Sequence, residues 1–240
     1  MDKETFCEKL IDQANKMEIL LNEEQQTKFY KYMELIIDWN KKINLTAITE
    51  PGEVINKHFI DSISILKQIE SKDKVVDIGT GAGFPGVPIK IANPSIEITL
   101  VDSLNKRINF LKEIIKELDL KGIEAVHARA EEFGQSKAYR EKYDVVTSRA
   151  VARLNILVEY MLPIVKVGGK CICMKGPESE EEIKEAQKAI NVLGGTIKNV
   201  EKFSLPETDI NRTIIVIEKN RETPETYPRK AGTPTKNPIK

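Results

Sequence analysis

The sequence predicts an α/β protein in which a doubly wound, mostly parallel, seven-stranded sheet follows an N-terminal helical segment. Apolar residues recur at helical spacing over the first part of the chain. From Lys74 onward, short continuous apolar runs alternate with helix-length segments, and a glycine-rich turn follows the first run. Parallel strands that are buried on both faces need continuous Val and Ile, so this alternation is typical of a sheet covered by helices on both sides.

Residues 1–70 form the predicted helical segment. Apolar residues at steps of three and four indicate two amphipathic helices. The first stripe consists of Phe6, Leu10, Ile11, Ala14 and Met17, and the second of Phe29, Met33, Ile36 and Ile37. A third helix is expected over about residues 52–68, because Pro51 and Gly52 interrupt the chain there.

Residues 71–220 form the predicted sheet domain. Its first five strands are the apolar runs KVVDI, IEITLVD, IEAVHA, YDVVTS and GKCICMKG. The pattern over Leu104–Leu118 indicates a crossover helix, and a later helix is expected over Glu178–Leu193. Two further strands, over Thr196–Ser204 and Arg212–Lys219, are close enough in sequence to pair as an antiparallel hairpin at one end of the sheet.

Residues 221–240 form a basic, proline-rich tail. Within it, residues 228–240 contain three prolines and four basic residues but no acidic residue. Proline at this density blocks both a helix and a central strand, so we expect an extended segment. The whole chain has 37 basic and 37 acidic residues. Its net charge of zero therefore hides an acidic-leaning body and a cationic tail.

The composition argues against several classes of protein. Apolar runs are only a few residues long, well short of the roughly 20 that span a bilayer. The N-terminus, MDKETFCEKL, lacks the apolar stretch of a signal peptide. Cys7, Cys171 and Cys173 are odd in number and have no CxxC spacing, so neither a disulfide framework nor a zinc site is expected. We therefore expect a cytoplasmic protein with no metal ion and no membrane partner.

The glycine-rich turn DIGTGAGFPG, residues 77–86, is the strongest single motif. Glycines such as Gly79 and Gly81 let the backbone take positive φ and approach a ligand. Phe84 occupies the position where a dinucleotide-binding turn needs its third glycine. This spacing weakens a nicotinamide interpretation and favours S-adenosylmethionine. A tight turn without a ligand is the alternative.

Polar residues follow the next three strands. Asp102 ends the second strand, where a carboxylate can accept both ribose hydroxyls of a nucleoside or cap the following helix. Ala130 and Glu131 follow the third strand, where a methyltransferase contacts adenine, although Glu131 also suits a solvated helix start. Arg149 ends the fourth strand, where it can hold a cofactor carboxylate, a phosphate or a base edge.

Two catalytic motifs are missing after the fourth strand. The chain has no Asn/Asp-Pro-Pro-aromatic motif, which serves exocyclic amines, and no cysteine nucleophile nearby, which serves C5 of pyrimidines. The methyl acceptor is therefore expected to be an atom that needs no activation.

The chain contains a series of short motifs whose residues and order resemble those of the small-subunit ribosomal RNA methyltransferase G family, also called glucose-inhibited division protein B. The resemblance extends over nearly the whole chain. The matching segments are WNK at 39–41, NLTAI at 44–48, HFIDS at 58–62, residues 77–88, Asp102-Ser103, Lys106-Arg107, Phe110-Leu111, SRAVA at 148–152, Lys175-Gly176 and PRKAGTP at 228–234. Ile63 and residues 89–92 depart from the family pattern, outside the ligand turn.

The resemblance implies methyl transfer from S-adenosylmethionine to N7 of a guanosine in a decoding-region loop of 16S ribosomal RNA. It implies cofactor contacts at Gly79, Phe84, Ala130 with Glu131, and Arg149, to which the strand-end argument adds Gly81 and Asp102. N7 carries a lone pair and no proton, so catalysis needs positioning and electrostatics rather than a base. Arg149 is the expected catalytic residue, and a monomer acting on 16S RNA or the small subunit is expected.

Other interpretations remain open at this level. The chain fits a methyltransferase for a small molecule or a protein, or a ribosome-assembly factor that binds the cofactor without turnover. His58 and Asp61 are expected to form a hydrogen-bonded helix pair that packs the N-terminal segment. Lys175 suits a phosphate contact or a solvated charge, and Trp39 is expected in the core. The cationic tail is expected to contact RNA phosphates.

Overall fold

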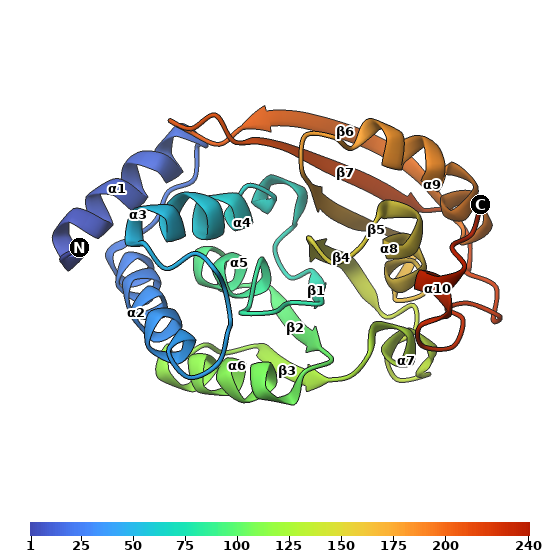
Figure 1. The fold of residues 1–240 in the computed structure, drawn as a ribbon, viewed down its shortest axis with the longest axis horizontal. Coiled ribbons are helices and arrows are strands. Elements are labelled where there is room, and N and C mark those ends of the chain that lie inside the picture. Colours follow the sequence, from blue (N-terminus) through green and yellow to red (C-terminus); the bar gives the residue numbers. More distant parts are fainter.

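The computed structural model describes residues 1–240, and its centre is a seven-stranded sheet in the order β3-β2-β1-β4-β5-β7-β6 (Figure 1). The strands are β1 (Lys74–Ile78), β2 (Glu97–Asp102), β3 (Ile123–His127), β4 (Tyr143–Arg149), β5 (Val165–Lys175), β6 (Gly195–Ser204) and β7 (Asn211–Lys219). The first five run parallel, whereas β7 is antiparallel to both β5 and β6. The predicted sheet and its terminal hairpin are confirmed.

Helices cover both faces of the sheet. The helices of the sheet domain are α5 (Gly86–Ala92), α6 (Asn105–Glu117), α7 (Ala130–Gln135), α8 (Leu154–Met161) and α9 (Glu180–Val192). Side chains alternate along each strand, so Val75 joins a core of 37 buried residues with α5 and α6. Its neighbour Val76 joins a second core of 23 buried residues with α8 and α9. The sheet therefore has one apolar core on each face, as a doubly wound fold requires.

The N-terminal helices share the larger core. These are α1 (Lys3–Lys16), α2 (Glu23–Asn40), α3 (Pro51–Val54) and α4 (Asp61–Ile63). Phe6, Phe29 and Phe59 are fully buried in the same cluster as Ile98 on β2 and Leu111 on α6. The segment 1–70 therefore shares one continuous apolar interior with the sheet, and its helices lie along one side of the molecule (Figure 1).

The predicted third helix is irregular. A π-helical turn, η1 (Ile55–Ile60), separates α3 from α4, and a short 3₁₀ turn, η2 (Leu66–Gln68), follows. A π turn often occurs at a functional site, and this one carries His58.

The second helix, α2, begins with a capping box at Asn22. The Asn22 side chain accepts a hydrogen bond from the backbone amide of Gln25, and the Gln25 side chain accepts one from the backbone amide of Asn22.

The C-terminal segment differs from its prediction. Residues 221–240 fold back onto the sheet domain, and a short helix, α10 (Thr233–Lys236), packs against α8 (Figure 1). The expectation of an extended, helix-free segment is therefore wrong at residues 233–236. Pro234 is the first-turn proline of α10 and is buried, so a residue that blocks helix interiors instead starts a helix here.

None of the helices combines the length and the apolar character that a membrane span requires.

Candidate active site

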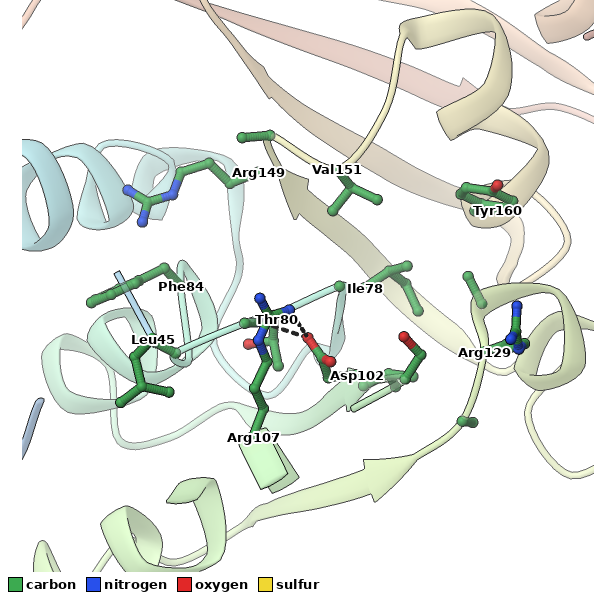
Figure 2. A pocket seen from close by; sticks show the side chains of 18 of the residues that line it. Leu45, Ile78, Thr80, Phe84, Asp102, Arg107, Arg129, Arg149, Val151 and Tyr160 are labelled. Atoms are coloured by element: carbon green, nitrogen blue, oxygen red, sulfur yellow. Dashed lines mark hydrogen bonds and ion pairs between the residues drawn. The ribbon is translucent and has the colours of Figure 1, made fainter. Parts of the chain in front are cut away.

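A cavity of about 550 Å³ opens at the carboxyl ends of β1, β2 and β4 (Figure 2). Parallel strands point their carboxyl ends to one edge, which is where doubly wound folds bind ligands. All seven residues that the sequence singled out for the site line it, namely Gly79, Gly81, Phe84, Asp102, Ala130, Glu131 and Arg149. Figure 2 shows Arg149 and Phe84 at one end of the cavity and Tyr160 and Arg129 at the other.

The glycine turn forms the floor of the cavity. Gly79 and Gly81 have φ of 69° and 61°, the left-handed region that favours glycine. A Cβ at Gly79 would lie 2.5 Å from a methyl of Val151, whereas a Cβ at Gly81 would meet nothing within 4 Å. The backbone at Gly81 is therefore exposed to the open space that a ligand would fill.

A buried carboxylate, Asp77, holds the turn from below. Its Oδ2 accepts hydrogen bonds from Thr80 Oγ1 at 2.6 Å and from the Gly86 amide at 2.9 Å, and its Oδ1 has no partner. Burial raises the pKa of Asp77 to about 6. Asp77, near the end of β1, therefore stabilises the glycine turn from the protein interior.

Of the two roles that the sequence leaves open for Asp102, the structure shows the helix cap and places the carboxylate at the cavity wall. Its Oδ1 accepts from the Leu104 amide at 2.9 Å, so it caps the start of α6. Its Oδ2 accepts from the Gly81 amide at 2.9 Å and from Arg107 Nη1 at 3.2 Å. Only 3% of the side chain is exposed, at the cavity wall. The carboxylate therefore joins the ends of β1 and β2 at the point where a ribose is expected.

Glu131 is buried rather than solvated. Its Oε1 accepts a hydrogen bond of 2.8 Å from the amide of Gly232 in the C-terminal segment. Gly232 and Thr235 also line the cavity, and Thr235 Oγ1 lies 3.1 Å from the hydroxyl of Tyr160 on α8. The solvated helix-start interpretation of Glu131 is therefore wrong.

Arg149 is held by three acceptors. Nη1 donates to Asp61 Oδ2 at 2.9 Å and to the carbonyl of Lys57 at 3.0 Å, and Nη2 lies 3.1 Å from His58 Nδ1. The guanidinium also lies 4.9 Å from the centre of the Phe84 ring, a cation–π contact. A cation at the mouth of the cavity is thus fixed in one orientation.

His58 and Asp61 do not bond to each other, so the predicted helix pair is wrong. Each bonds Arg149 instead, and Asp61 Oδ1 also accepts from Arg212 Nε at 2.9 Å. The His58 ring stacks on Phe84 with centroids 4.3 Å apart. The π turn carries His58 and ends just before Asp61, so both side chains lie beside Arg149.

The His58 ring is neutral. Burial, and next the Arg149 cation, lower the pKa of His58 to about 3. Because arginine only donates hydrogen bonds, Nδ1 is the acceptor and Nε2 carries the proton. Nε2 therefore donates to Thr46 Oγ1, which lies at 2.8 Å, and both ring nitrogens are occupied.

A second cavity of about 580 Å³ adjoins the first. The two share His58, Arg149, Ala150 and Val151 in their walls. The wall of the second cavity contains four cations other than Arg149, namely Lys57, Arg153, Lys175 and Arg212, and two carboxylates, Asp61 and Glu182, which pair with Arg212 and Lys175. The segment after β4 therefore separates two compartments, one next to the glycine turn and one with a mainly basic wall.

Two other sequence interpretations are resolved by contacts. Lys175 Nζ donates to the carbonyl of Ala152 at 2.5 Å and to Glu182 Oε2 at 2.7 Å, with 9% of its side chain exposed, so it is not a solvated charge. Trp39 is half-buried, and its ring packs edge-on against Phe110 at 5.5 Å. Trp39 therefore lies at the edge of the core rather than inside it, as a partly buried residue packed against the larger cluster.

The sequence missed two contributors to the site. The first is Asp61, for which the sequence predicts His58 as the partner, whereas its partners Arg212 and Arg149 are 151 and 88 residues away. The second is the C-terminal segment, for which the proline content predicts an extended chain, although PRKAGTP at 228–234 belongs to the motif set. No group of three or more His, Cys, Asp or Glu side chains lies close enough together to hold a metal ion.

Comparison with known proteins agrees with this geometry. A family model described as rRNA small subunit methyltransferase G matches residues 25–212. A protein from Desulforamulus reducens named ribosomal RNA small subunit methyltransferase G is 58% identical over 228 residues, which cover 94% of this chain and 95% of that protein. A protein of the same name from Alkaliphilus oremlandii is 53% identical over 229 residues, with 95% and 96% covered.

Solved structures of lower identity share the fold. M. jannaschii TYW2 in complex with AdoMet is 14% identical with a TM-score of 0.51, and the match covers 65% of this chain and 74% of that one. TrmN from Thermus thermophilus is also 14% identical with a TM-score of 0.51, covering 69% and 53%. The predicted fold of the S-adenosylmethionine-dependent methyltransferase class is confirmed. From the family match and the near full-length relatives, the chain belongs to the rRNA small subunit methyltransferase G family.

Proposed function

We propose that this protein transfers a methyl group from S-adenosylmethionine to N7 of a guanosine in a decoding-region loop of 16S ribosomal RNA. The observation that carries the proposal is the pair of adjoining cavities on either side of Arg149 and Val151. One has the glycine turn and nucleoside-type carboxylates, and the other has a mainly basic wall. The family to which the chain belongs supports the ribosomal RNA substrate.

The residues of the first cavity fit the cofactor. Gly81 exposes its backbone to open space of the size that small-ligand sites have. In the proposed assignment, Asp102 accepts the ribose hydroxyls and Gly79 and Gly81 let the backbone approach. Ala130 and Glu131 contact adenine.

The opposite end of this cavity suits the charged part of the cofactor. Phe84 and Arg149 are assigned to the methionine part, whose carboxylate suits a guanidinium. Arg149 keeps 14% of its side chain exposed while three acceptors hold it. It can therefore bind an anion without being reoriented.

Bound S-adenosylmethionine supplies an electrophilic methyl group. Guanine N7 offers a lone pair and has no proton to lose, so the chain needs to align the acceptor rather than deprotonate it. The neutral, fully hydrogen-bonded His58 suits a positioning role. Arg149 contributes a fixed positive charge, which we propose orients the reactants as the catalytic residue.

The second cavity suits the acceptor nucleotide. Phosphate contacts by lysine and arginine position RNA, and Lys57, Arg153 and Arg212 line this cavity.

We further propose that the protein is a monomer, and a ribosomal RNA substrate implies a cytoplasmic location. Sedimentation at micromolar concentration tests the first of these, and a second copy in the active species would contradict it.

The activity is tested with labelled S-adenosylmethionine and small subunits, or naked 16S RNA, from cells that lack the enzyme. Label in a single guanosine, mapped by nuclease digestion and mass spectrometry as a 7-methyl derivative, is the expected result. Label in a protein or metabolite but not in RNA would contradict the proposal. Binding to subunits without any label would favour an assembly factor.

A substitution at the shared wall connects the activity to the site. Arg149→Lys keeps the charge but loses the planar fork, and we expect kcat/KM to fall at least about tenfold. Arg221→Lys, at an exposed arginine outside both cavities, is the control. Equal activity of the two variants would argue against a role for Arg149.

A further inference from the structure

The C-terminal segment is held on the sheet domain by specific polar contacts. Arg140 donates to the carbonyls of Thr223 and Tyr227, each at 2.6 Å, and Gln135 Nε2 donates to the carbonyl of Pro228 at 2.8 Å. These carbonyls lie 83 to 93 residues away in sequence. Residues 223–228 are thereby attached to the end of α7 and the turn that follows it.

A buried ion pair then attaches the next residue. Glu159 on α8 has a fully buried side chain, and it accepts from the Arg229 amide at 2.9 Å, from Nε at 2.9 Å and from Nη2 at 2.6 Å. A buried carboxylate needs such a partner. Arg229, the first cation of residues 228–240, is therefore occupied by an ion pair with a buried carboxylate. Lys230, Lys236 and Lys240 are the exposed ones.

Beyond this ion pair, the chain reaches the main cavity. The Gly232 amide donates to Glu131 Oε1 at 2.8 Å, and Gly232 has φ of 80°. Thr235 Oγ1 pairs with the Tyr160 hydroxyl at 3.1 Å. Gly232, Thr235, Tyr160 and Glu131 all line the cavity, at the end opposite Arg149.

We propose that Arg229, Gly232 and Thr235 make the C-terminal segment a wall of the cofactor site, at the end that holds the purine. This inference rests on the proposed use of S-adenosylmethionine. Gly232 holds one oxygen of Glu131 and leaves the other for an exocyclic amino group, which donates hydrogen bonds. The Thr235–Tyr160 hydroxyl pair can donate to or accept from a ring nitrogen. The tail then serves cofactor binding rather than RNA binding.

The inference is tested by calorimetric titration with S-adenosylhomocysteine in the absence of RNA. The chains compared are the intact protein, a truncation that ends at Pro228, and Gly232→Pro. Proline removes the N–H that reaches Glu131 and cannot adopt positive φ, but it leaves the Arg229–Glu159 pair in place. We expect at least about a tenfold loss of affinity for both variants, about the loss of one good polar contact.

The control replaces Lys230, Lys236 and Lys240 together with Ala, which removes the three exposed cations of residues 228–240 at positions outside the cavity wall. We expect its affinity for S-adenosylhomocysteine to equal that of the intact protein. Circular dichroism and thermal melting show whether each variant is folded. If the truncated chain does not fold, Gly232→Pro decides the result.

Two outcomes have different meanings. If the intact protein does not bind S-adenosylhomocysteine, the proposed function itself fails. If the intact protein binds it and the folded variants bind it equally well, the tail is not a wall of the site. In that case, a flatter salt dependence of RNA binding in the triple Lys variant, by about 0.9 per lost phosphate contact, would assign the tail to RNA instead.

Discussion

Single side chains at the carboxyl edge of the sheet each satisfy a structural need and face the cavity. Asp102 caps α6 and holds the Gly81 amide with the same carboxylate. Arg149 completes the hydrogen bonding of Asp61 and lies over Phe84. Because these groups are held by several partners, the site is largely preorganised, which is what a reaction based on positioning requires.

The open space at Gly81 gives a matched pair of substitutions. Gly81 and Gly168 both have positive φ, at 61° and 84°, and a Cβ at either meets nothing within 4 Å. Alanine at either position should lower the free energy of unfolding by about 1 kcal/mol through backbone strain. Only Gly81→Ala should weaken S-adenosylhomocysteine binding, by at least about tenfold, because its Cβ enters the cavity.

Calorimetry and urea unfolding measure the two effects separately. Gly168 lies outside the cavity, so its variant corrects for strain. Full cofactor affinity in Gly81→Ala would show that the turn does not approach the ligand.

The neutral His58 predicts an acid sensitivity. Its pKa is about 3 in the folded protein but about 6.5 in an unfolded chain. The unfolded chain therefore binds a proton that the folded one lacks between these values, so this contribution to stability is present above pH 6.5 and is lost as the pH falls toward 3. Asp77 acts in the opposite sense: its raised pKa of about 6 gives stability that is lost as the pH rises from about 4 through 6.

Replacing His58 separates the two effects. In His58→Gln, we expect the free energy of unfolding relative to the native protein to rise by about 1.4 kcal/mol for each pH unit below 6.5. Urea unfolding at pH 4.5, 5.5 and 6.5 measures it. His127→Gln, at the exposed second histidine, is the control. Parallel stability profiles for His58→Gln and the native protein would contradict a neutral, buried His58.

At the scale of elements, the N-terminal helices support the glycine turn. Tyr32 on α2 is fully buried, and its hydroxyl donates to the carbonyl of Ala82 at 2.5 Å. The Tyr32 ring stacks on Phe59 in the π turn at 5.4 Å and contacts Phe84 at 5.6 Å. The helical segment thus reaches the floor of the cavity through one tyrosine and one aromatic cluster.

Removing this hydroxyl tests the support. Tyr32→Phe leaves the Ala82 carbonyl unpaired in the interior, so the free energy of unfolding should fall by about 1–2 kcal/mol. Affinity for S-adenosylhomocysteine should fall several-fold as the turn loosens. Tyr30→Phe, a half-buried tyrosine on the same helix, is the control. A stable Tyr32→Phe with full affinity would show that α2 does not brace the turn.

At the scale of the whole molecule, residues 1–70 and the sheet share one core. The cluster of 37 buried residues contains side chains from α1, α2 and the π turn together with β2 and α6. We propose that the helical segment 1–70 and the domain 71–220 are distinct in sequence pattern but fold as one unit, to which the segment 221–240 is attached.

Unfolding in urea tests this proposal, because the single tryptophan, Trp39, lies on α2. Its fluorescence reports on the packing of the helical segment against α6, while far-ultraviolet circular dichroism reports on the whole chain. We expect the two midpoints to coincide within error, since the shared core must be lost at once. An earlier fluorescence transition would show that residues 1–70 unfold independently.

Much of the fold was predictable because its signals are local. Each of the strands β1 to β5 is identified by its own apolar run, without reference to the strands beside it. The two-residue period of a strand then assigns alternate residues to opposite faces of the sheet. The irregular helix over Pro51–Ile63 was only partly predictable, because the apolar residues of its π turn have the spacing of an ordinary helix and are buried in the core as such residues would be. The local pattern therefore does not distinguish the π turn from a regular helix.

The sequence alone predicts the doubly wound class, the glycine turn and seven of the residues that line the cavity, from the motifs and because parallel strands bring their carboxyl ends to a common edge. Only the tertiary structure shows which distant groups form hydrogen bonds with the residues of the site. It paired Asp61 with Arg149 and Arg212, gave His58 its neutral state, and brought Gly232 to Glu131 across 101 residues. These contacts depend on long-range packing and burial, and no local pattern encodes which distant group will satisfy a buried charge.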